Sequence, residues 1–250
     1  MDGQTLRRSD GLILAALLLA IGCTLAGWLA GRGFARARSM DRYVTVKGIS
    51  EREARADVAF WPLRLVVADN DLGTAHSRLR SQVAQVRAFL ARQQLDTGQV
   101  ELQSFSVSDA FANQYRETGG IANRYVIRQV LMVRSTEPDR VLAASQRVGE
   151  LVSAGIVLSS GEEYGSGGPT FVFSGLNELK PAMIAEATGR AREAAEQFAR
   201  DSRSVLGGIR RASQGVFEIL PRDQAPGVVE GSQIVKNVRV VTTVEFSLRN

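Results

Sequence analysis

An uncharged run near the amino end constrains this chain more than any other feature of its sequence. Residues 11–31, GLILAALLLAIGCTLAGWLAG, contain no Asp, Glu, Lys or Arg in 21 positions. As a helix rising about 1.5 Å per residue, such a run crosses a hydrocarbon core of roughly 30 Å. A buried core helix would carry a polar stripe, and this segment has none. We therefore predict a transmembrane helix or uncleaved signal anchor over residues 11–31, with a short tail at 1–10 and a polar linker at 32–42.

Two other fates of this segment stay open. Cleavage would use the small-x-small residues Ala-Arg-Ala at 35–37, which follow Arg32 and a longer apolar run than signal peptides usually carry. Lipidation would use Cys23, because the four residues that end at this cysteine, Ala-Ile-Gly-Cys, resemble a bacterial lipobox. Retention is favoured by Trp28, whose ring suits a membrane interface, and by the arginines that follow at 32, 36 and 38.

The arginines that flank the run also bear on its orientation. Arg7 and Arg8 precede it, whereas four arginines lie between residues 32 and 42. Under the positive-inside rule, this count places the carboxyl-terminal domain in the cytoplasm.

The charge of the chain does not indicate a nucleic-acid-binding protein. The net charge is +5, but residues 1–42 hold six of the 31 basic and three of the 26 acidic residues. Residues 43–250 therefore carry 25 basic against 23 acidic side chains, and a net +2 offers little field to attract a phosphate backbone. Cys23 and His76 are the only cysteine and histidine, which excludes an intramolecular disulfide, a cysteine metal site and a multi-histidine zinc site.

Beyond the linker, the sequence alternates between strand and helix patterns. We predict strands at 43–49, 57–68, 99–111, 123–135, 155–158, 169–174, 209–219 and 234–250, and helices at 70–95, 138–154 and 177–207. A strand-helix-strand-strand unit occurs twice in this order, at 57–135 and at 169–248. Such units favour mixed or antiparallel sheets with helices packed on them, which is an α+β fold.

Periodicity also predicts which side chains share a face. In the second strand these are Trp61, Leu63, Leu65 and Val67, and Pro62 indicates an edge position or a bulge there. In the first helix the apolar stripe is Leu72, Leu79, Val83, Val86 and Leu90, and in the last helix it is Leu179, Met183, Ala187, Ala191, Ala194 and Phe198.

Several stretches in a fixed order make residues 43–248 resemble the SIMPL domain of bacterial envelope proteins. They are VTVKGISEREARADVAFWPLRL, NRYVIRQVLMVR, GIVL before a glycine-rich loop, FVFSGLNEL and AEATGRAREAAEQFARDSRSVLGGI. Where relatives commonly show a Gly-x-Gly-Glu turn and a Pro-Asp pair, this chain has Gly-Ile-Ser-Glu at 48–51 and Ala-Asp at 56–57. We assign one SIMPL-like domain to residues 43–250.

The resemblance implies a secreted or membrane-anchored periplasmic protein with an α+β fold, a tendency to oligomerise and a link to envelope or oxidative stress. It implies no defined reaction and offers no catalytic residues. The resemblance and the arginine count predict opposite sides of the membrane for the domain. We follow the resemblance, because the export of such proteins concerns the whole domain. We therefore expect a single-pass protein of the bacterial inner membrane with its carboxyl-terminal domain in the periplasm.

The residues that could carry chemistry have simpler explanations. His76 could transfer protons or bind a metal, but a helix residue half covered by the sheet explains it, since no Ser-His-Asp set can be assigned. Asp69 and Asp71 could bind a cation, but without EF-hand spacing we expect them to cap a helix. Glu162 and Glu163 are adjacent in a glycine-rich loop, which does not hold the separation that acid and base catalysis needs. We assign no catalytic, cofactor-binding or metal-binding residue, and no cofactor.

The expected function is that of a non-enzymatic, oligomeric scaffold or interaction module in envelope or oxidative stress defence. Apolar side chains on both faces of several strands fit either burial between subunits or a two-sided core. The expected partners are the inner membrane, further copies of the chain and a protein that the sequence does not identify; nucleic acid is not among them. Two alternatives stay open: an accessory subunit of a membrane transport or signalling complex, and a hydrolase whose carboxylates converge in a cleft from separate strands.

Overall fold

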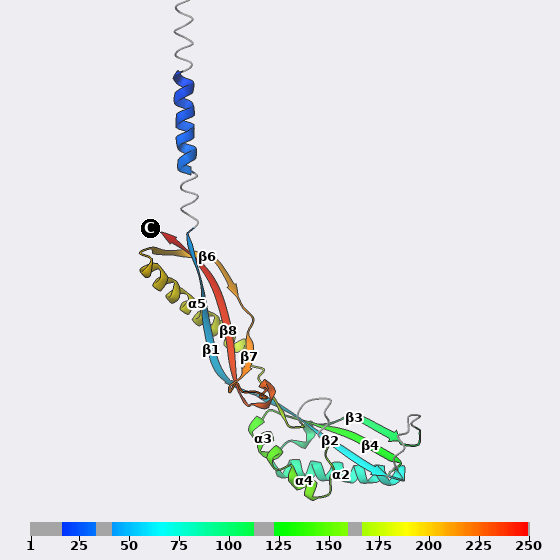
Figure 1. The fold of residues 1–250 in the computed structure, drawn as a ribbon. Helices are drawn as coiled ribbons and strands as arrows, with labels where there is room; N and C mark the ends of the chain where they lie inside the picture. Colours follow the sequence, from blue (N-terminus) through cyan, green and yellow to red (C-terminus); the bar gives the residue numbers. More distant parts are fainter. Residues whose placement is uncertain (1–16, 34–41, 113–122, 160–166, 250) are drawn as a thin grey trace, which may run out of the picture. The chain divides into compact units, whose positions relative to one another are not determined.

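The computed structural model describes residues 17–33, 42–112, 123–159 and 167–249. They form an α+β fold, as predicted, in which helices accompany two antiparallel sheets (Figure 1). The chain divides into two compact units. We call them the terminal unit, which comprises residues 1–50, 184–216 and 241–250, and the inserted unit, which comprises residues 51–183 and 217–240.

A helix over residues 17–33 covers most of the apolar run predicted to form the anchor, and residues 11–16 lie outside the described residues. Its side chains are exposed, Cys23 among them. Near its end, the Arg32 guanidinium lies 4.0 Å from the centre of the Trp28 ring, which is a cation–π contact. No helix in the described part of the chain is both long enough and apolar enough to span a membrane.

The sheet of the inserted unit has the strand order β3-β4-β2-β5. Its strands are β2 (Val58–Asp69), β3 (Val100–Asp109), β4 (Tyr125–Ser135) and β5 (Thr170–Val172), and neighbours pair antiparallel. The helices α2 (Leu72–Arg92), α3 (Pro138–Gln146) and α4 (Gly149–Ser153) lie together on one side of this sheet (Figure 1). Short 3₁₀ turns occur at Thr97–Gln99 and Glu230–Ser232.

Alternating side chains decide which face of this sheet the helices cover. On β2, Trp61, Leu63 and Leu65 are at most 2% exposed, whereas the residues between them are half-buried. This confirms the predicted inward face, which packs in one core with Ala75, Leu79, Val86, Phe89 and Leu90 of α2. Leu72 is 43% exposed because it opens the helix, so the buried stripe begins later than predicted, at Ala75.

Pro62 occupies a position where β2 is locally an edge, as its missing N–H predicts. β5 pairs with β2 only from Val58 to Phe60. Further along β2, the Val66 N–H donates to the carbonyl of residue 157, and the carbonyl of residue 64 accepts from the N–H of residue 159. Pro62 lies in the gap between these two sets of hydrogen bonds, where the sheet needs no donor.

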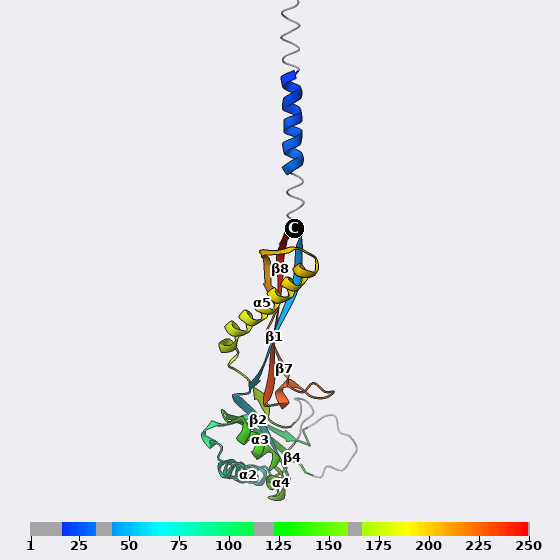
Figure 2. The same ribbon diagram turned by 90° about the vertical axis from the view of Figure 1, so that its left-hand side faces the viewer.

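The other sheet has the order β1-β8-β6, with β7 paired to β8. Its strands are β1 (Tyr43–Arg55), β6 (Val205–Gln214), β7 (Glu218–Pro221) and β8 (Val235–Arg249). The terminal unit contains β6, the first part of β1, the last part of β8 and most of helix α5 (Leu176–Asp201), which runs beside these strands (Figure 2). Its small core consists of Val46, Ala191, Ala195, Val244 and Phe246.

Helix α5 approaches β1 most closely at Gly48. A Cβ at this position would lie 1.8 Å from the carbonyl oxygen of Ala187 and 2.5 Å from the backbone nitrogen of Ala191. Two residues further on, the buried Ser50 hydroxyl donates to Glu186 Oε2 at 2.9 Å. Residues 48–51 are part of a strand, since β1 continues to residue 55 instead of ending at 49 as predicted.

The buried stripe of α5 differs from the predicted one. Four alanines at 187, 191, 195 and 199 are at most 4% exposed, whereas Phe198 is 58% exposed. A spacing of four residues advances about 40° beyond a full helical turn, so the stripe winds around the helix as the neighbouring sheet twists. The close approach at Gly48 leaves room only for small side chains, and the prediction that Phe198 faces inward is therefore wrong.

The helix predicted at 177–207 ends at Asp201, because residues 205–207 belong to β6, and three further predicted elements are absent or divided in the structure. Residues 155–158 form no strand but a single bridge, from Leu158 to Leu65. The helix predicted at 138–154 is divided into α3 and α4, because tight hydrogen bonds three residues apart replace the helical pattern at Val148. The strand predicted at 209–219 is divided into β6 and β7 beside Gly215, whose N–H donates to the carbonyl of residue 241.

The strand-helix-strand-strand unit does occur twice, but the second copy is built from other strands than predicted. The first copy is β2-α2-β3-β4, with spatial order β3-β4-β2. The second copy is β1-α5-β6-β8, with the equivalent order β6-β8-β1. β5, which was predicted to begin this copy, pairs with β2 instead. The chain therefore inserts one copy between the first strand and the helix of the other, a long-range pairing that sequence order does not indicate.

Candidate functional site

The paired aspartates near the start of α2 have structural roles. Asp71 is the N-cap of this helix, as predicted, and accepts a hydrogen bond from the Thr74 N–H at 2.7 Å. This bond lowers the pKa of Asp71. Asp69 accepts from the Asp71 N–H at 3.2 Å and pairs with Arg78 at 3.2 Å, so its carboxylate fastens the end of β2 to the helix.

His76 and the adjacent glutamates do not take part in a site that the structure describes. His76 lies on α2 and is exposed, so the expectation that the sheet half covers it is wrong. The preceding residue, Ala75, takes the inward position and turns His76 toward solvent. Glu162 and Glu163 lie outside the described residues. Within the described ranges, no group of three or more His, Cys, Asp or Glu side chains could hold a metal ion.

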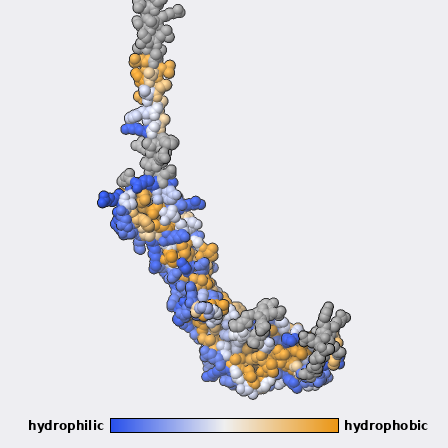
Figure 3. Space-filling model, viewed as in Figure 1, coloured by the Kyte–Doolittle hydropathy of each residue, from blue (hydrophilic) through white to orange (hydrophobic). Residues whose placement is uncertain are grey.

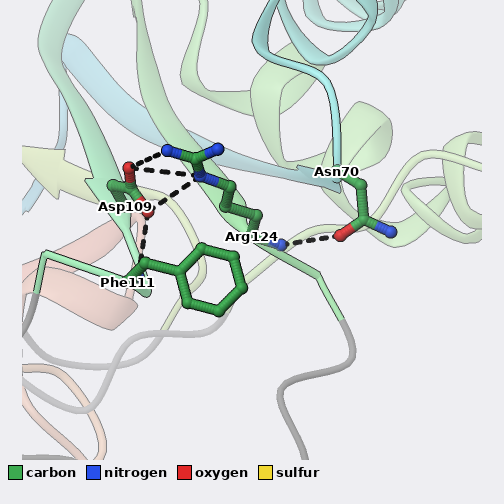
Figure 4. A network of polar contacts seen from close by, with 4 residues as sticks. All are labelled: Asn70, Asp109, Phe111 and Arg124. Carbon is green, nitrogen blue, oxygen red and sulfur yellow. Dashed lines mark hydrogen bonds and ion pairs between the residues drawn. The ribbon is translucent and has the colours of Figure 1, made fainter.

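A polar network fastens the ends of β2, β3 and β4 to one another (Figure 4). Asp109, at the end of β3, accepts from Arg124 Nη2 at 3.1 Å and from the Phe111 N–H at 2.9 Å. The Arg124 N–H donates to Asn70 Oδ1 at 3.0 Å. The bond from Arg124 lowers the pKa of Asp109, and the same bond raises the pKa of Arg124. Sequence reasoning missed this network because its members are 15 and 54 residues apart.

The face of the sheet turned away from α2 is hollowed into a groove of about 610 Å³. The described residues that line it are six apolar residues, four with hydroxyls, two with amides and two arginines: Phe60, Pro62, Leu65, Val66, Val130 and Met132; Ser104, Ser106, Ser159 and Thr170; Gln103 and Gln129; Arg64 and Arg128. Among the described residues, no Asp or Glu lines it. The described lining of this groove therefore lacks the convergent carboxylates that a hydrolase would need.

Arg64 and Arg128 lie on neighbouring strands of this face. In the register, Arg64 is opposite Val130 and Arg128 is opposite Val66, so the two arginines are diagonal neighbours. The Arg64 Nη1 atom is buried and has no hydrogen-bond partner among the described residues. Glu101, which β3 places on the same face, accepts a hydrogen bond from Gln103 Nε2 at 3.4 Å instead of pairing with either arginine.

A β-bulge in β3 shapes one wall of the groove. The pairing of β3 with β4 shifts between Gln103 and Phe105, and Ser104 has a φ of 39°. Gln129 is 7% exposed and donates from Nε2 to the carbonyl of Gln103 at 2.7 Å. Because the bulge adds one residue to β3, Leu102 and Phe105 point to the same face although three positions separate them. Regular alternation would have placed them on opposite faces.

β3 forms an edge of the sheet and carries exposed apolar side chains. Leu102, Phe105 and Val107 share the face on which Leu131 and Ile127 of β4 are buried. The helices leave β3 uncovered, and the three side chains are 56%, 55% and 44% exposed. In Figure 3, hydrophobic residues (orange) are visible on the part of the inserted unit where Figure 1 shows β2–β4 and α2. The sequence predicted the strand but not this exposure, because the bulge and the reach of α2 are not visible in it.

Comparisons with known proteins bear on the whole domain. The family model SIMPL, described as a protein of unknown function (DUF541), matches residues 44–246. The comparison with curated proteins finds no match. The family match confirms the resemblance that the sequence shows over residues 43–248.

Proposed function

From the premise that this chain belongs to the SIMPL family, we propose that it acts by assembly and not by catalysis. It is a membrane-anchored module that associates with further copies of itself. Its domain lies on the periplasmic side of the bacterial inner membrane and serves as a scaffold in envelope or oxidative stress defence. The exposed apolar edge of β3 is the observation that supports assembly most.

An edge strand offers a row of backbone N–H and C=O groups to any strand that reaches it. β3 is ten residues long and, within the described part of the chain, pairs with β4 alone. Proteins commonly protect such edges with lysine, proline, short strand length or a β-bulge, and of these β3 has the bulge at Ser104. The sequence from Val100 to Asp109 contains no Lys, Arg or Pro. The bulge at Ser104 keeps Leu102, Phe105 and Val107 on one face, where they form a continuous apolar strip.

A second copy of β3 is the partner that suits this edge. Two copies related by a two-fold axis bring the same surface of each together, which gives a closed, isologous contact. Antiparallel pairing of the two edges joins the two sheets and places the two apolar strips side by side. Burial of apolar surface contributes about 25 cal/mol per Å², so three large side chains on each copy supply a substantial part of the contact energy.

Replacement of Phe105 by glutamate tests this contact. Phe198→Glu on α5 is the matched control, because the Phe198 side chain is 58% exposed and that of Phe105 is 55% exposed. Sedimentation velocity of the full chain in a neutral detergent gives the mass of the protein part. We expect dimers or larger assemblies for the wild type and Phe198→Glu, and monomers for Phe105→Glu. A monomeric wild type, or an assembled Phe105→Glu variant, would contradict the proposal.

The anchor is proposed from the uncharged run at 11–31, and the contact of Arg32 with Trp28 supports an interfacial position for this end. Fractionation without detergent should find the full-length protein with the membranes; a soluble full-length protein would remove the anchor. A carboxyl-terminal alkaline phosphatase fusion should be active and the matching green fluorescent protein fusion dark. The opposite pair of readings would place the domain in the cytoplasm, as the arginine count does.

The stress role makes a separate prediction that depends on assembly. A strain that lacks this protein should tolerate peroxide less well than its parent. Expression of the wild type or Phe198→Glu should restore tolerance, and Phe105→Glu should not. If all three proteins restore it equally, the stress role does not require the β3 contact.

A further inference from the structure

Arg64 is a costly residue in its position. A guanidinium stays charged at all pH values that a protein meets. Its Nη1 atom is buried and unpartnered among the described residues. A buried charged donor without a partner destabilises a fold, and an apolar side chain of similar length would avoid that cost. The geometry therefore points to a ligand that supplies the missing acceptor.

Arg128 makes the same end of the groove more positive. It is the diagonal neighbour of Arg64, and like charges placed so close repel one another. Ser106 is directly opposite Arg128 on β3 and adds a hydroxyl to this end. Within the described ranges no Asp or Glu lines the groove, so none of the described carboxylates neutralises these arginines there. An anion between Arg64 and Arg128 would remove the repulsion and satisfy the buried donor together.

The other end of the groove, which we call the apolar end, has three apolar side chains beside Thr170, and Glu101, which is opposite Met132 on this face, does not line it. Toward the start of β2, Phe60 and Pro62 line it from one strand and Met132, which is opposite Pro62, lines it from β4. The charged end and the apolar end thus lie in successive rows of one sheet face. A volume of about 610 Å³ is in the range of pockets that hold small organic ligands.

We propose that this groove binds a small amphiphile with a single carboxylate, of the fatty-acid class. The carboxylate lies between Arg64 and Arg128, where a guanidinium fork offers paired N–H donors, and the hydrocarbon chain lies along Phe60, Pro62 and Met132. The site is independent of the assembly proposed above, because the apolar strip of β3 is on the opposite face of the sheet.

Octanoate is a suitable probe because it is soluble and has both parts of the proposed ligand. Titration calorimetry uses the full chain in lipid nanodiscs, with empty nanodiscs as the blank for partitioning into lipid. We expect saturable binding of octanoate, and at least tenfold weaker binding of both octanol and acetate. Equal binding of octanol would overturn recognition of the charge, equal binding of acetate would overturn recognition of the chain, and no saturable octanoate binding would overturn the site.

Arg64→Met and Arg134→Met form a matched pair of variants. Arg134 is opposite Phe60 on the same sheet face but does not line the groove. We expect Arg64→Met to weaken octanoate binding at least tenfold and Arg134→Met to leave it unchanged. Thermal unfolding of Arg64→Met should occur at or above the wild-type temperature, because the variant removes a buried unpaired donor. Wild-type affinity in Arg64→Met, or an equal loss in both variants, would overturn the assignment.

Discussion

Gly48→Ala tests the closest contact in the terminal unit. The new Cβ would lie 1.8 Å from the Ala187 carbonyl oxygen and 2.5 Å from the Ala191 nitrogen. Both are backbone atoms of α5, so the clash cannot be relieved by rotating a side chain, and the helix has to move away from β1. Overpacking a core by one methyl group typically costs 1–3 kcal/mol, and a backbone clash belongs at the upper end, about 3 kcal/mol.

For a chain of this size, 1 kcal/mol corresponds to about 2–4 °C in the unfolding midpoint, so we expect Gly48→Ala to unfold roughly 6–12 °C below the wild type. Circular dichroism of the full chain in neutral detergent measures this. Gly189→Ala is the matched control, because Gly189 is an exposed position inside α5 where a new Cβ would meet no atom within 4 Å apart from the local backbone of the helix itself. That change should raise the midpoint, since alanine favours a helix over glycine by about 1 kcal/mol. A Gly48→Ala variant as stable as the wild type would refute the close packing of α5 on β1.

Two further substitutions test the inserted unit. Leu65→Ala should lower the free energy of unfolding by about 2–5 kcal/mol, because this side chain is fully buried, whereas Val66→Ala on the other face should cost well under half as much, as urea unfolding would show. Because Arg124 holds the pKa of Asp109 below its usual value of about 3.9, the stability that this pair adds is present above that pH and is lost as pH falls through the native pKa. The midpoint difference between wild type and Asp109→Asn should therefore be larger at neutral pH than near pH 2; an unchanged difference would mean that the pair does not stabilise the fold.

Local patterns predicted the elements of this fold well where one side of an element is buried. The alternation of Trp61, Leu63 and Leu65 gave the inward face of β2, and Asp71 was identified as a cap from its place before an apolar helix. Apolar periodicity gave a wrong orientation for Phe198, because this rule places a large apolar side chain on the face of the helix that packs against the core. Here the distance between backbones at Gly48 decides that alanine faces inward.

Features that depend on long-range pairing could not be read from the sequence. The second strand-helix-strand-strand unit begins with β1 instead of the predicted β5. Residues 56–175 therefore separate this strand from its helix, α5. The bulge at Ser104 is equally hidden, since serine is not a residue that usually marks a positive φ. That bulge determines which side chains of β3 form the apolar strip. That Arg64 Nη1 has no hydrogen-bond partner among the described residues depends on which side chains fail to reach it, and only the assembled sheet shows this.

Hydrogen–deuterium exchange along β3 tests assembly through this edge most directly. Peptides that cover Val100–Asp109 would be followed by mass spectrometry on the full chain at two protein concentrations a hundredfold apart. We expect these amides to become more protected at the higher concentration in the wild type and in Phe198→Glu, and we expect no such gain in Phe105→Glu. If the mass of the wild-type protein rises with concentration but the exchange rates of the β3 amides stay the same, the copies contact one another at a different surface.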